Sequence, residues 1–169
     1  MSGPIAVLVG PPGAGKTSVG RALAARLAVP FIDTDELVVE RAGKSVADIF
    51  VEDGESVFRQ MEAQAVADAV GHEGAVVALG GGAITNAGTR ELLKTKPVVL
   101  LEVDPATAAK RVGMNGARPL LLGDARARLV TLMRERAPWY AEVASISVPT
   151  TDCSVEDVVA QIQAWCAHE

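Results

Sequence analysis

The chain has 169 residues, which suits one domain with a substantial buried core, and its 49% apolar and 22% charged residues exclude extensive disorder. The longest apolar runs are only strand-length, too short to span a membrane, and the net charge of −5 argues against broad nucleic-acid binding. The chain enters its first apolar run without a basic stretch or cleavage site, and its two cysteines, Cys153 and Cys166, lack metal-ligand spacing. We therefore expect a cytoplasmic protein with two free thiols that binds neither nucleic acid nor membranes.

The first apolar run, residues 5–9, is β-branched and predicts a buried parallel strand. It is followed by Gly10-Pro-Pro-Gly-Ala-Gly-Lys-Thr17, which fits G-x-x-x-x-G-K-[ST], and then by a helical pattern over 18–27. In this context backbone N–H groups surround an anion at a helix N-terminus, whereas a chance glycine-rich turn would lack the strand and helix on either side. We therefore predict a nucleoside triphosphate site made by Gly13, Ala14, Gly15, Lys16, Thr17 and Ser18.

A second short strand, residues 30–33, ends in the acidic cluster Asp33-Thr-Asp35. In open α/β sheets ligands gather at the carboxyl ends of the strands, so an Asp beside a phosphate-binding loop is well placed to hold Mg²⁺. The alternative is that Asp33 or Asp35 only caps the helix that we expect over 36–41. Capping would account for one of these carboxylates but not for both.

Ser45-Val-Ala-Asp48 resembles a capping box that opens a short helix, and a longer helix is expected over 55–70. Arg59 lies on this longer helix within reach of Glu55 and Glu62. It is either a solvated ion-pair partner or an anion-binding residue oriented by Glu62, and the spacing leaves both open. The buried face of the helix is expected to carry Val57, Met61, Ala65 and Ala69.

The continuous apolar run 75–79 predicts a buried strand that ends in three glycines, Gly80, Gly81 and Gly82. Glycines at a strand end let a ligand approach the backbone closely and present N–H groups to it, although a flexible turn is the alternative. Asn86 is expected to cap a helix over 87–94, and residues 97–101 form the fourth strand.

Asp104-Pro105 is typical of a helix start, and this helix is expected to reach about residue 111. The following stretch, about 113–123, is bounded by glycines and carries one cation beside a proline, Arg118. Loops of this kind in phosphoryl-transfer enzymes close over the site and deliver positive charge, so we predict a mobile lid. An ordinary surface connection would have the same spacing.

An arginine-rich helix over 125–136 is expected to end at Ala137-Pro138-Trp139-Tyr140, and residues 146–148 form a fifth strand before the last helix. The alternation of strands and helices predicts an α/β protein, a three-layer α/β/α sandwich with a five-stranded parallel sheet. No repeat, linker or second domain is evident, so we expect a single domain over 1–169. Nothing in the sequence marks an oligomer interface, and a monomer is expected.

Several motifs occur in one order along the chain: Gly10–Thr17, Asp33-Thr-Asp35, Phe58-Arg59, Gly80-Gly-Gly82, Arg118-Pro-Leu-Leu121 and Arg136-Ala-Pro-x-Tyr140. Together they resemble shikimate kinase, most closely its actinobacterial and mycobacterial members. The phosphate-binding loop alone is generic, whereas the acidic pair, the triple glycine and the Arg-Pro of the lid make the resemblance specific. It extends from about residue 4 to the last helix.

The resemblance implies a P-loop fold like that of nucleoside monophosphate kinases, and transfer of the ATP γ-phosphoryl group to the 3-hydroxyl of shikimate in the chorismate pathway. Asp35 would bind the ring hydroxyls and accept a proton. Lys16 and Arg118 would balance charge on the transferred group, while Thr17 and Asp33 would serve Mg²⁺. The shikimate site would draw on the helical segment of about 34–62 and on Arg59, Gly80, Gly81, Gly82 and Arg136.

One departure from the family concerns the adenine. Arg111 matches the residue that stacks on one face of the base, but residues 150–155, Thr-Thr-Asp-Cys-Ser-Val, lack the Arg and Pro that relatives carry near the other face. We therefore expect the base to be held from one side, and a strict preference for ATP does not follow.

Three other functions are considered beside this resemblance. Gluconate is the closest alternative acceptor because it too is a polyhydroxy acid, whereas a nucleoside monophosphate would need a base pocket and cations for two phosphoryl groups. A nucleotide-binding switch without turnover is the alternative from a different class. It is disfavoured because the Asn-Lys-x-Asp guanine signature is missing and Lys16, Asp35 and Arg118 are all present.

Overall fold

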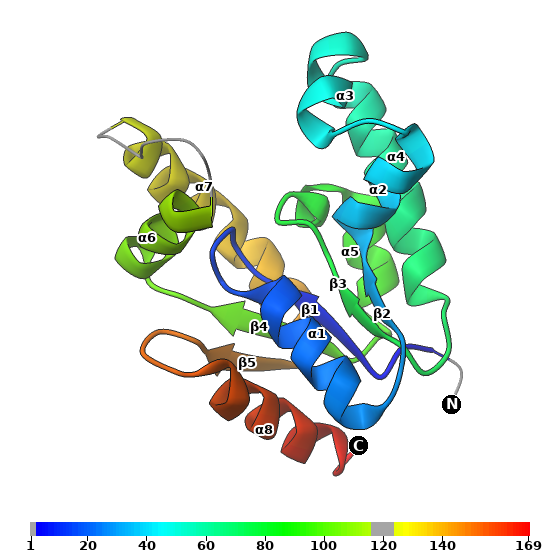
Figure 1. Cartoon of the computed structure of the whole chain (residues 1–169), viewed down its shortest axis with the longest axis vertical. Helices are drawn as coiled ribbons and strands as arrows, with labels where there is room; N and C mark the ends of the chain where they lie inside the picture. Colours follow the sequence, from blue (N-terminus) through cyan, green and yellow to red (C-terminus); the bar gives the residue numbers. More distant parts are fainter. Residues whose placement is uncertain (1–2, 116–123) are drawn as a thin grey trace.

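The computed structural model describes residues 3–115 and 124–169 and contains a five-stranded sheet in the order β2-β3-β1-β4-β5 (Figure 1). Every pair of neighbouring strands is parallel, as the sequence predicts. Val7 on the central strand lies between Val77 and Val98, and Ile32 at one edge is in register with Val77. The strands are β1 (Ala6–Val9), β2 (Phe31–Asp33), β3 (Val76–Ala78), β4 (Val98–Glu102) and β5 (Ile146–Pro149).

Helices cover both faces of the sheet, which is why β1 is a continuous apolar run rather than an alternating one. Ala6 and Leu8 pack with α1 and α8 on one face, whereas Val7 and Val9 pack with α4, α5 and α7 on the other. The expected three-layer arrangement is confirmed. The helices are α1 (Lys16–Leu27), α2 (Thr34–Ala42), α3 (Val46–Glu52), α4 (Glu55–Val70), α5 (Ala87–Leu93), α6 (Pro105–Asn115), α7 (Asp124–Val143) and α8 (Val155–Cys166).

Two smaller apolar clusters extend the structure beyond the sheet at its carboxyl end. Val38, Ile49 and Phe58 hold α2, α3 and α4 together, and Ala108 and Leu129 join α6 to α7. Figure 1 shows these two helical groups on either side of the loop that connects β1 to α1. The phosphate-binding loop therefore lies between two separately packed groups of helices.

The predicted helix starts are confirmed at atomic detail. Ser45 and Asn86 accept hydrogen bonds from the N–H groups three residues ahead, at 3.1 and 2.9 Å. Asp104 and Ser154 do the same, at 2.8 and 3.1 Å. Each cap satisfies one of the N–H groups that a helix start leaves without a partner, so these residues fix where the chain turns into a helix.

The expected end of the arginine-rich helix at Pro138 is wrong, because α7 continues through Pro138 to Val143. Proline removes a hydrogen bond to the carbonyl four residues earlier and normally ends or bends a helix. Here one face of the turns beyond it is buried: Tyr140 and Val143 pack in the core against the sheet. Their burial stabilises the last turns, and the local signal from proline is overridden.

Two smaller expectations also need correction. On α4 the buried face carries Phe58, Glu62, Ala65, Val66 and Ala69, while Val57 is exposed, because the helix packs both on the sheet and on α2. The helix α6 extends to Asn115, so the first three residues of the expected lid are helical. The rest of that lid, including Arg118, lies outside the described residues.

Across the described part of the chain, no helix combines the length and apolar character needed to cross a membrane.

Candidate active site

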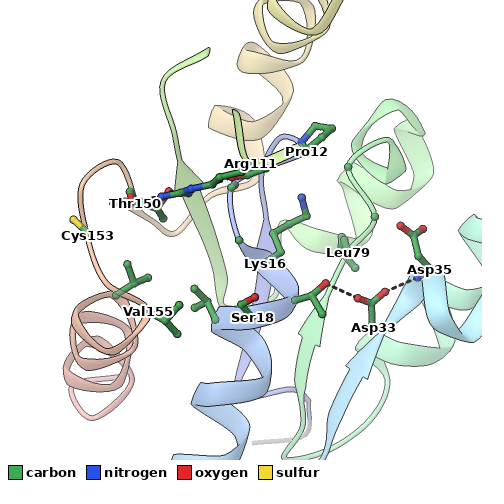
Figure 2. Close-up of a pocket in the computed structure, with 18 of the residues that line it drawn as sticks. Pro12, Lys16, Ser18, Asp33, Asp35, Leu79, Arg111, Thr150, Cys153 and Val155 are labelled. Atoms are coloured by element: carbon green, nitrogen blue, oxygen red, sulfur yellow. Dashed lines mark hydrogen bonds between the residues drawn. The ribbon is translucent and has the colours of Figure 1, made fainter. Parts of the chain in front are cut away.

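A cavity of about 570 Å³ opens where the carboxyl ends of β1, β2 and β3 meet (Figure 2). This is the edge at which parallel sheets bind ligands. The predicted nucleotide residues and both predicted carboxylates line it together. From the predicted site it takes Gly13, Ala14, Gly15, Lys16, Thr17, Ser18, Asp33, Asp35, Gly80, Gly81 and Arg111.

The loop between β1 and α1 has the backbone of a phosphate cradle. Gly13 and Gly15 adopt positive φ angles of 83° and 91°, which favour glycine. Gly15 is the N-cap of α1 and offers no side-chain acceptor to the first N–H groups of the helix, so the positive end of the helix dipole faces the cavity. One detail differs from the expected arrangement: the N–H of Ala14 donates to the carbonyl of Pro11 at 3.1 Å.

Lys16 is the cation at the centre of this cradle. Its ammonium donates to the carbonyls of Gly10 at 2.7 Å and Pro11 at 3.0 Å. Burial lowers the pKa of Lys16 to about 8, against the opposing attraction of Asp35 and Asp33. A half-buried lysine that meets mainly neutral carbonyls is poised to bind an anion, because an added negative charge restores the stability of its protonated form.

The hydroxyl of Thr17 donates to Oδ2 of Asp33 at 2.9 Å, and this contact joins the start of α1 to the end of β2 (Figure 2). The other oxygen of Asp33 accepts the N–H groups of Asp35 and Glu36, so Asp33 also caps α2. The capping interpretation of Asp33 is therefore confirmed, and its second oxygen is held by Thr17. A carboxylate and a hydroxyl are hard oxygen donors, and Mg²⁺ at phosphate sites takes one or two such ligands and completes its shell with phosphate and water. The donor set fits Mg²⁺.

Asp35 lies in the first turn of α2 and faces the same cavity. Burial raises its pKa above the ordinary value, and the neighbouring charge of Asp33 raises it further, while Lys16 and Arg59 oppose the shift. A carboxylate with a raised pKa is a stronger base than an ordinary one. The two aspartates thus have different surroundings: Asp33 is bound by three hydrogen bonds, and Asp35 is the candidate base.

The three glycines after β3 do not adopt positive φ angles, and what they provide is space for neighbouring groups. A Cβ on Gly80 would lie 2.8 Å from the carboxyl carbon of Asp35, and one on Gly82 would lie 2.9 Å from the guanidinium carbon of Arg59. On Gly81 it would lie 3.3 Å from the ring of Pro12. Each glycine therefore leaves room for a different element of the site.

Arg59 extends from α4 toward this glycine turn and is held by a buried partner. Its guanidinium donates to Oε1 of Glu62 at 2.8 Å, while Glu55 lies farther away at 3.8 Å. Glu62 is only 3% exposed; burial raises its pKa, and the hydrogen bond and charge of Arg59 oppose that shift. Of the two interpretations left open, the structure favours an oriented arginine over a solvated ion pair.

Arg136 approaches the same turn from α7. It donates to the carbonyl of Gly81 at 3.1 Å, and the hydroxyl of Tyr140 donates to that same carbonyl at 2.9 Å. Within the described ranges, Nε of Arg136 is buried and has no hydrogen-bond partner. A buried N–H without a partner is costly, and an anion bound at this position would satisfy it. Arg59, Gly82 and Arg136 do not line this cavity, and Arg136 is connected to it through its hydrogen bond to Gly81.

The far end of the cavity, opposite Asp35, is formed by Arg111 and by the loop that leads into α8 (Figure 2). Thr150, Cys153 and Val155 contribute to this wall. The cavity thus has a phosphate cradle in its middle, an acidic end beside the glycine turn and a mixed polar and apolar end at α8.

Sequence reasoning missed two residues that shape this site. The hydroxyl of Thr34, fully buried, accepts the N–H of Gly80 at 3.1 Å and ties the turn to α2. Tyr140 anchors Gly81 from the other side. The sequence places Thr34 inside the acidic motif and Tyr140 inside the Arg136 motif, but both partners are long-range, and no local pattern reveals them.

Comparison with known proteins identifies close similarities over almost the whole chain. A family model described as "Shikimate kinase" matches residues 12–167. A shikimate kinase of Thermobifida fusca (strain YX) is 57% identical over 156 residues, covering 92% of this chain and 91% of that protein. One of Rhodococcus jostii (strain RHA1) is 51% identical over 98% of this chain and 99% of that protein. A structure of shikimate kinase from Acinetobacter baumannii in complex with shikimate superposes with a TM-score of 0.91 at 34% identity, covering 99% and 94% of the two chains.

Proposed function

The chain belongs to the shikimate kinase family, and we propose that the cavity between the phosphate-binding loop and the Gly80–Gly82 turn binds ATP and shikimate side by side. The enzyme phosphorylates shikimate with ATP. The observation that carries the assignment of residues is the two-ended cavity. Its phosphate cradle lies between the carboxylate of Asp35 at one end and the wall formed by Arg111 and Thr150 at the other. The relatives with high sequence identity are shikimate kinases, which disfavours gluconate as the acceptor and a switch without turnover.

On the donor side, Gly13, Gly15 and Lys16 bind the β- and γ-phosphates through backbone N–H groups and the ammonium. Thr17 and Asp33 would hold Mg²⁺, whose positive charge offsets the negative charge of the phosphate oxygens. The residues thereby place the γ-phosphorus at the inner end of the cradle, on the side of Asp35. In such a loose transition state positioning and cationic stabilisation supply most of the rate acceleration.

On the acceptor side, Arg59 and Arg136 bind the carboxylate of shikimate. Two guanidinium forks match a carboxylate with paired N–H groups, which gives orientation as well as affinity. The unpartnered Nε of Arg136 would gain its missing acceptor from this anion. With the carboxylate fixed at Gly81 and Gly82, the ring hydroxyls face Asp35.

In the transfer step, Asp35 accepts the proton of the 3-hydroxyl as that oxygen forms a bond to the γ-phosphorus. The bond between the γ-phosphorus and the bridging oxygen breaks, and ADP leaves with its electron pair. Lys16 balances the charge on the transferred group. Arg118 is assigned the same task from the sequence alone, since it lies outside the described residues.

Three further expectations remain proposals. The chain forms one domain over 1–169, in which about 34–62 is the shikimate-binding helical segment and about 113–123 is the lid. The enzyme is a cytoplasmic monomer, and light scattering at several concentrations would reveal any dimer. Arg111 packs on one face of the base and residues 150–155 lack the Arg and Pro for the other face, so other nucleoside triphosphates are accepted to a greater extent than a two-sided clamp would allow.

The direct test is a coupled assay of ADP release with Mg²⁺-ATP, with shikimate, with gluconate and without an acceptor. We expect release that depends on shikimate and is at background level with gluconate. Turnover with gluconate, or release independent of any acceptor, would overturn the assignment of the acceptor side. Replacing ATP by GTP or CTP in the same assay measures how strongly the enzyme prefers adenine over other bases.

Adding a methyl group at the glycine turn is expected to damage shikimate binding without affecting ATP. Gly82→Ala pushes the guanidinium of Arg59 away from the turn, so KM for shikimate should rise about tenfold or more, since a bond to a charged group is weakened. Gly88→Ala, exposed on α5 with only Asn86 nearby, is the matched control. Equal changes in KM for ATP and shikimate would show that the turn has collapsed rather than that Arg59 has moved.

The pH dependence of ATP capture should report Lys16. In the free enzyme its pKa is lowered to about 8, so kcat/KM for ATP should fall as the pH rises through that value and the ammonium loses its proton. Bound phosphates raise the pKa of Lys16 again, so kcat at saturating ATP should hold to higher pH. Lys16→Arg, always protonated, should lose this alkaline limb even though its activity is lower. A limb that persists in Lys16→Arg would assign it to another group.

A further inference from the structure

Arg111 is fixed by hydrogen bonds to two segments that lie far from it in sequence. Its guanidinium donates to the carbonyl of Gly13 at 3.2 Å, to Oγ1 of Thr150 at 3.2 Å and to the carbonyl of Thr150 at 2.9 Å. These bonds connect α6 to the phosphate-binding loop and to the segment that leaves β5. In Figure 2 the side chain of Arg111 extends across the upper side of the cavity to Thr150.

Thr150 is itself held so that its hydroxyl oxygen faces Arg111. The hydroxyl donates its hydrogen to the carbonyl of Glu102 at 2.8 Å, and the N–H of Thr150 donates to the same carbonyl at 2.8 Å. Because the hydrogen is committed to Glu102, the lone pairs of the hydroxyl are left to accept from Arg111. With only 3% of Thr150 exposed, little water competes for this arrangement.

The helix that carries Arg111 also packs directly on the phosphate-binding loop. A Cβ on Gly13 would lie 2.6 Å from the carbonyl oxygen of Ala108, so the two backbones are in close contact. The position of α6 is therefore defined by the loop, and the direction of the Arg111 side chain is defined by Thr150. A guanidinium whose plane is fixed in advance loses less entropy when a flat aromatic ring packs on it.

We propose that Thr150 is a positioning residue for nucleotide binding: its hydroxyl holds the guanidinium of Arg111 in the plane against which the base packs. The inference rests on the proposed function, since it requires the base to lie at the end of the cavity lined by Arg111, Thr150, Cys153 and Val155. Thr150 itself acts only through Arg111. Removing the Thr150 hydroxyl thus weakens the nucleotide complex and leaves the acceptor side intact.

The test compares four variants with the wild type by calorimetric titration with Mg²⁺ and a non-hydrolysable ATP analogue. Thr150→Val removes the hydroxyl at constant volume and should weaken binding about tenfold, the value expected for a lost hydrogen bond to a charged group. Thr150→Ser keeps the hydroxyl and should bind like the wild type. Arg111→Ala should weaken binding as well, and Arg111→Ala combined with Thr150→Val should bind no more weakly than Arg111→Ala alone.

Thr151→Val is the matched control for a general effect on the loop. The hydroxyl of Thr151 accepts the N–H of Asp104 at 3.1 Å, so its loss loosens the same segment without touching Arg111. We expect Thr151→Val to keep wild-type nucleotide affinity. In Thr150→Val, kcat and KM for shikimate should also stay unchanged. Should Thr150→Val not fold, Thr150→Ala removes the same hydroxyl without a branched replacement.

Several results would overturn the proposal. They are a Thr150→Val effect that persists undiminished in the Arg111→Ala background, an equal effect of Thr151→Val, or a rise in KM for shikimate. If Arg111→Ala leaves nucleotide affinity unchanged while shikimate is still phosphorylated, this inference fails and the proposed function stands. Absence of shikimate-dependent ADP release from the wild type would instead refute the proposed function.

Discussion

Replacing Asp35 by Asn should lower kcat by about 10²- to 10⁴-fold, the range that a positioned general base supplies, while ATP still binds. The amide has the shape of the carboxylate, so the contact with Gly80 and the start of α2 are retained. It cannot accept a proton from the attacking hydroxyl. The experiment compares kcat from the coupled assay with the affinity for Mg²⁺-ATP measured by titration.

Glu36→Gln is the control for the loss of charge at Asp35, because Glu36 is the next residue, is exposed and pairs only with Arg21 among the described residues. It should retain wild-type kcat. The pH profile adds a second readout. The pKa of Asp35 is raised in the free enzyme, so kcat/KM for shikimate should fall as the pH drops through a value above the ordinary 3.8, and Asp35→Asn should lack that acid limb. Near-normal kcat in Asp35→Asn would remove this residue from the chemical step.

Replacing Arg136 by Ala should raise KM for shikimate by about 100-fold, because a charge-assisted, bidentate contact with a carboxylate is lost. The glycine turn should survive, since Tyr140 still donates to the carbonyl of Gly81. We therefore expect a nearly unchanged KM for ATP. Steady-state kinetics with each substrate varied in turn separate the two constants.

Two variants on the same helix sharpen this result. Arg134→Ala removes an exposed arginine two residues away and should leave both KM values unchanged. Arg136→Lys keeps the charge but not the fork and should fall between wild type and Arg136→Ala. If KM for ATP rises with KM for shikimate in Arg136→Ala, the arginine supports the whole cavity rather than the acceptor carboxylate.

The local signals in this sequence predicted a large part of the fold. Apolar runs gave each strand to within about one or two residues, and Ser45, Asn86 and Ser154 marked helix starts because capping depends on residues three apart. The P-loop and the acidic pair were likewise readable from neighbouring residues. What failed was decided by tertiary contacts. Pro138 remains inside α7 because one face of the turns after it is buried.

The same distinction applies to the site. The strand-end position of Gly80–Gly82 indicated close approach, but nothing in the sequence specified that Asp35 and Arg59 would fill the space next to two of them. The bond between Arg111 and Thr150 joins residues 39 positions apart, beyond the reach of any local pattern. Long-range hydrogen bonds of this kind determine which of several plausible partners each side chain takes.

The polar groups that make this site competent also make it a thermodynamic weak point. Lys16 and Asp35 both have pKa values moved by burial against their charged forms, and Nε of Arg136 is buried without an acceptor in the part of the chain described. Each of these groups lowers the free energy of unfolding relative to an apolar residue of similar size. Selection for heat resistance alone would thus enrich substitutions at these three positions and yield sturdier proteins that no longer turn over substrate. A directed-evolution campaign on this enzyme should therefore screen for residual catalysis and thermal tolerance together.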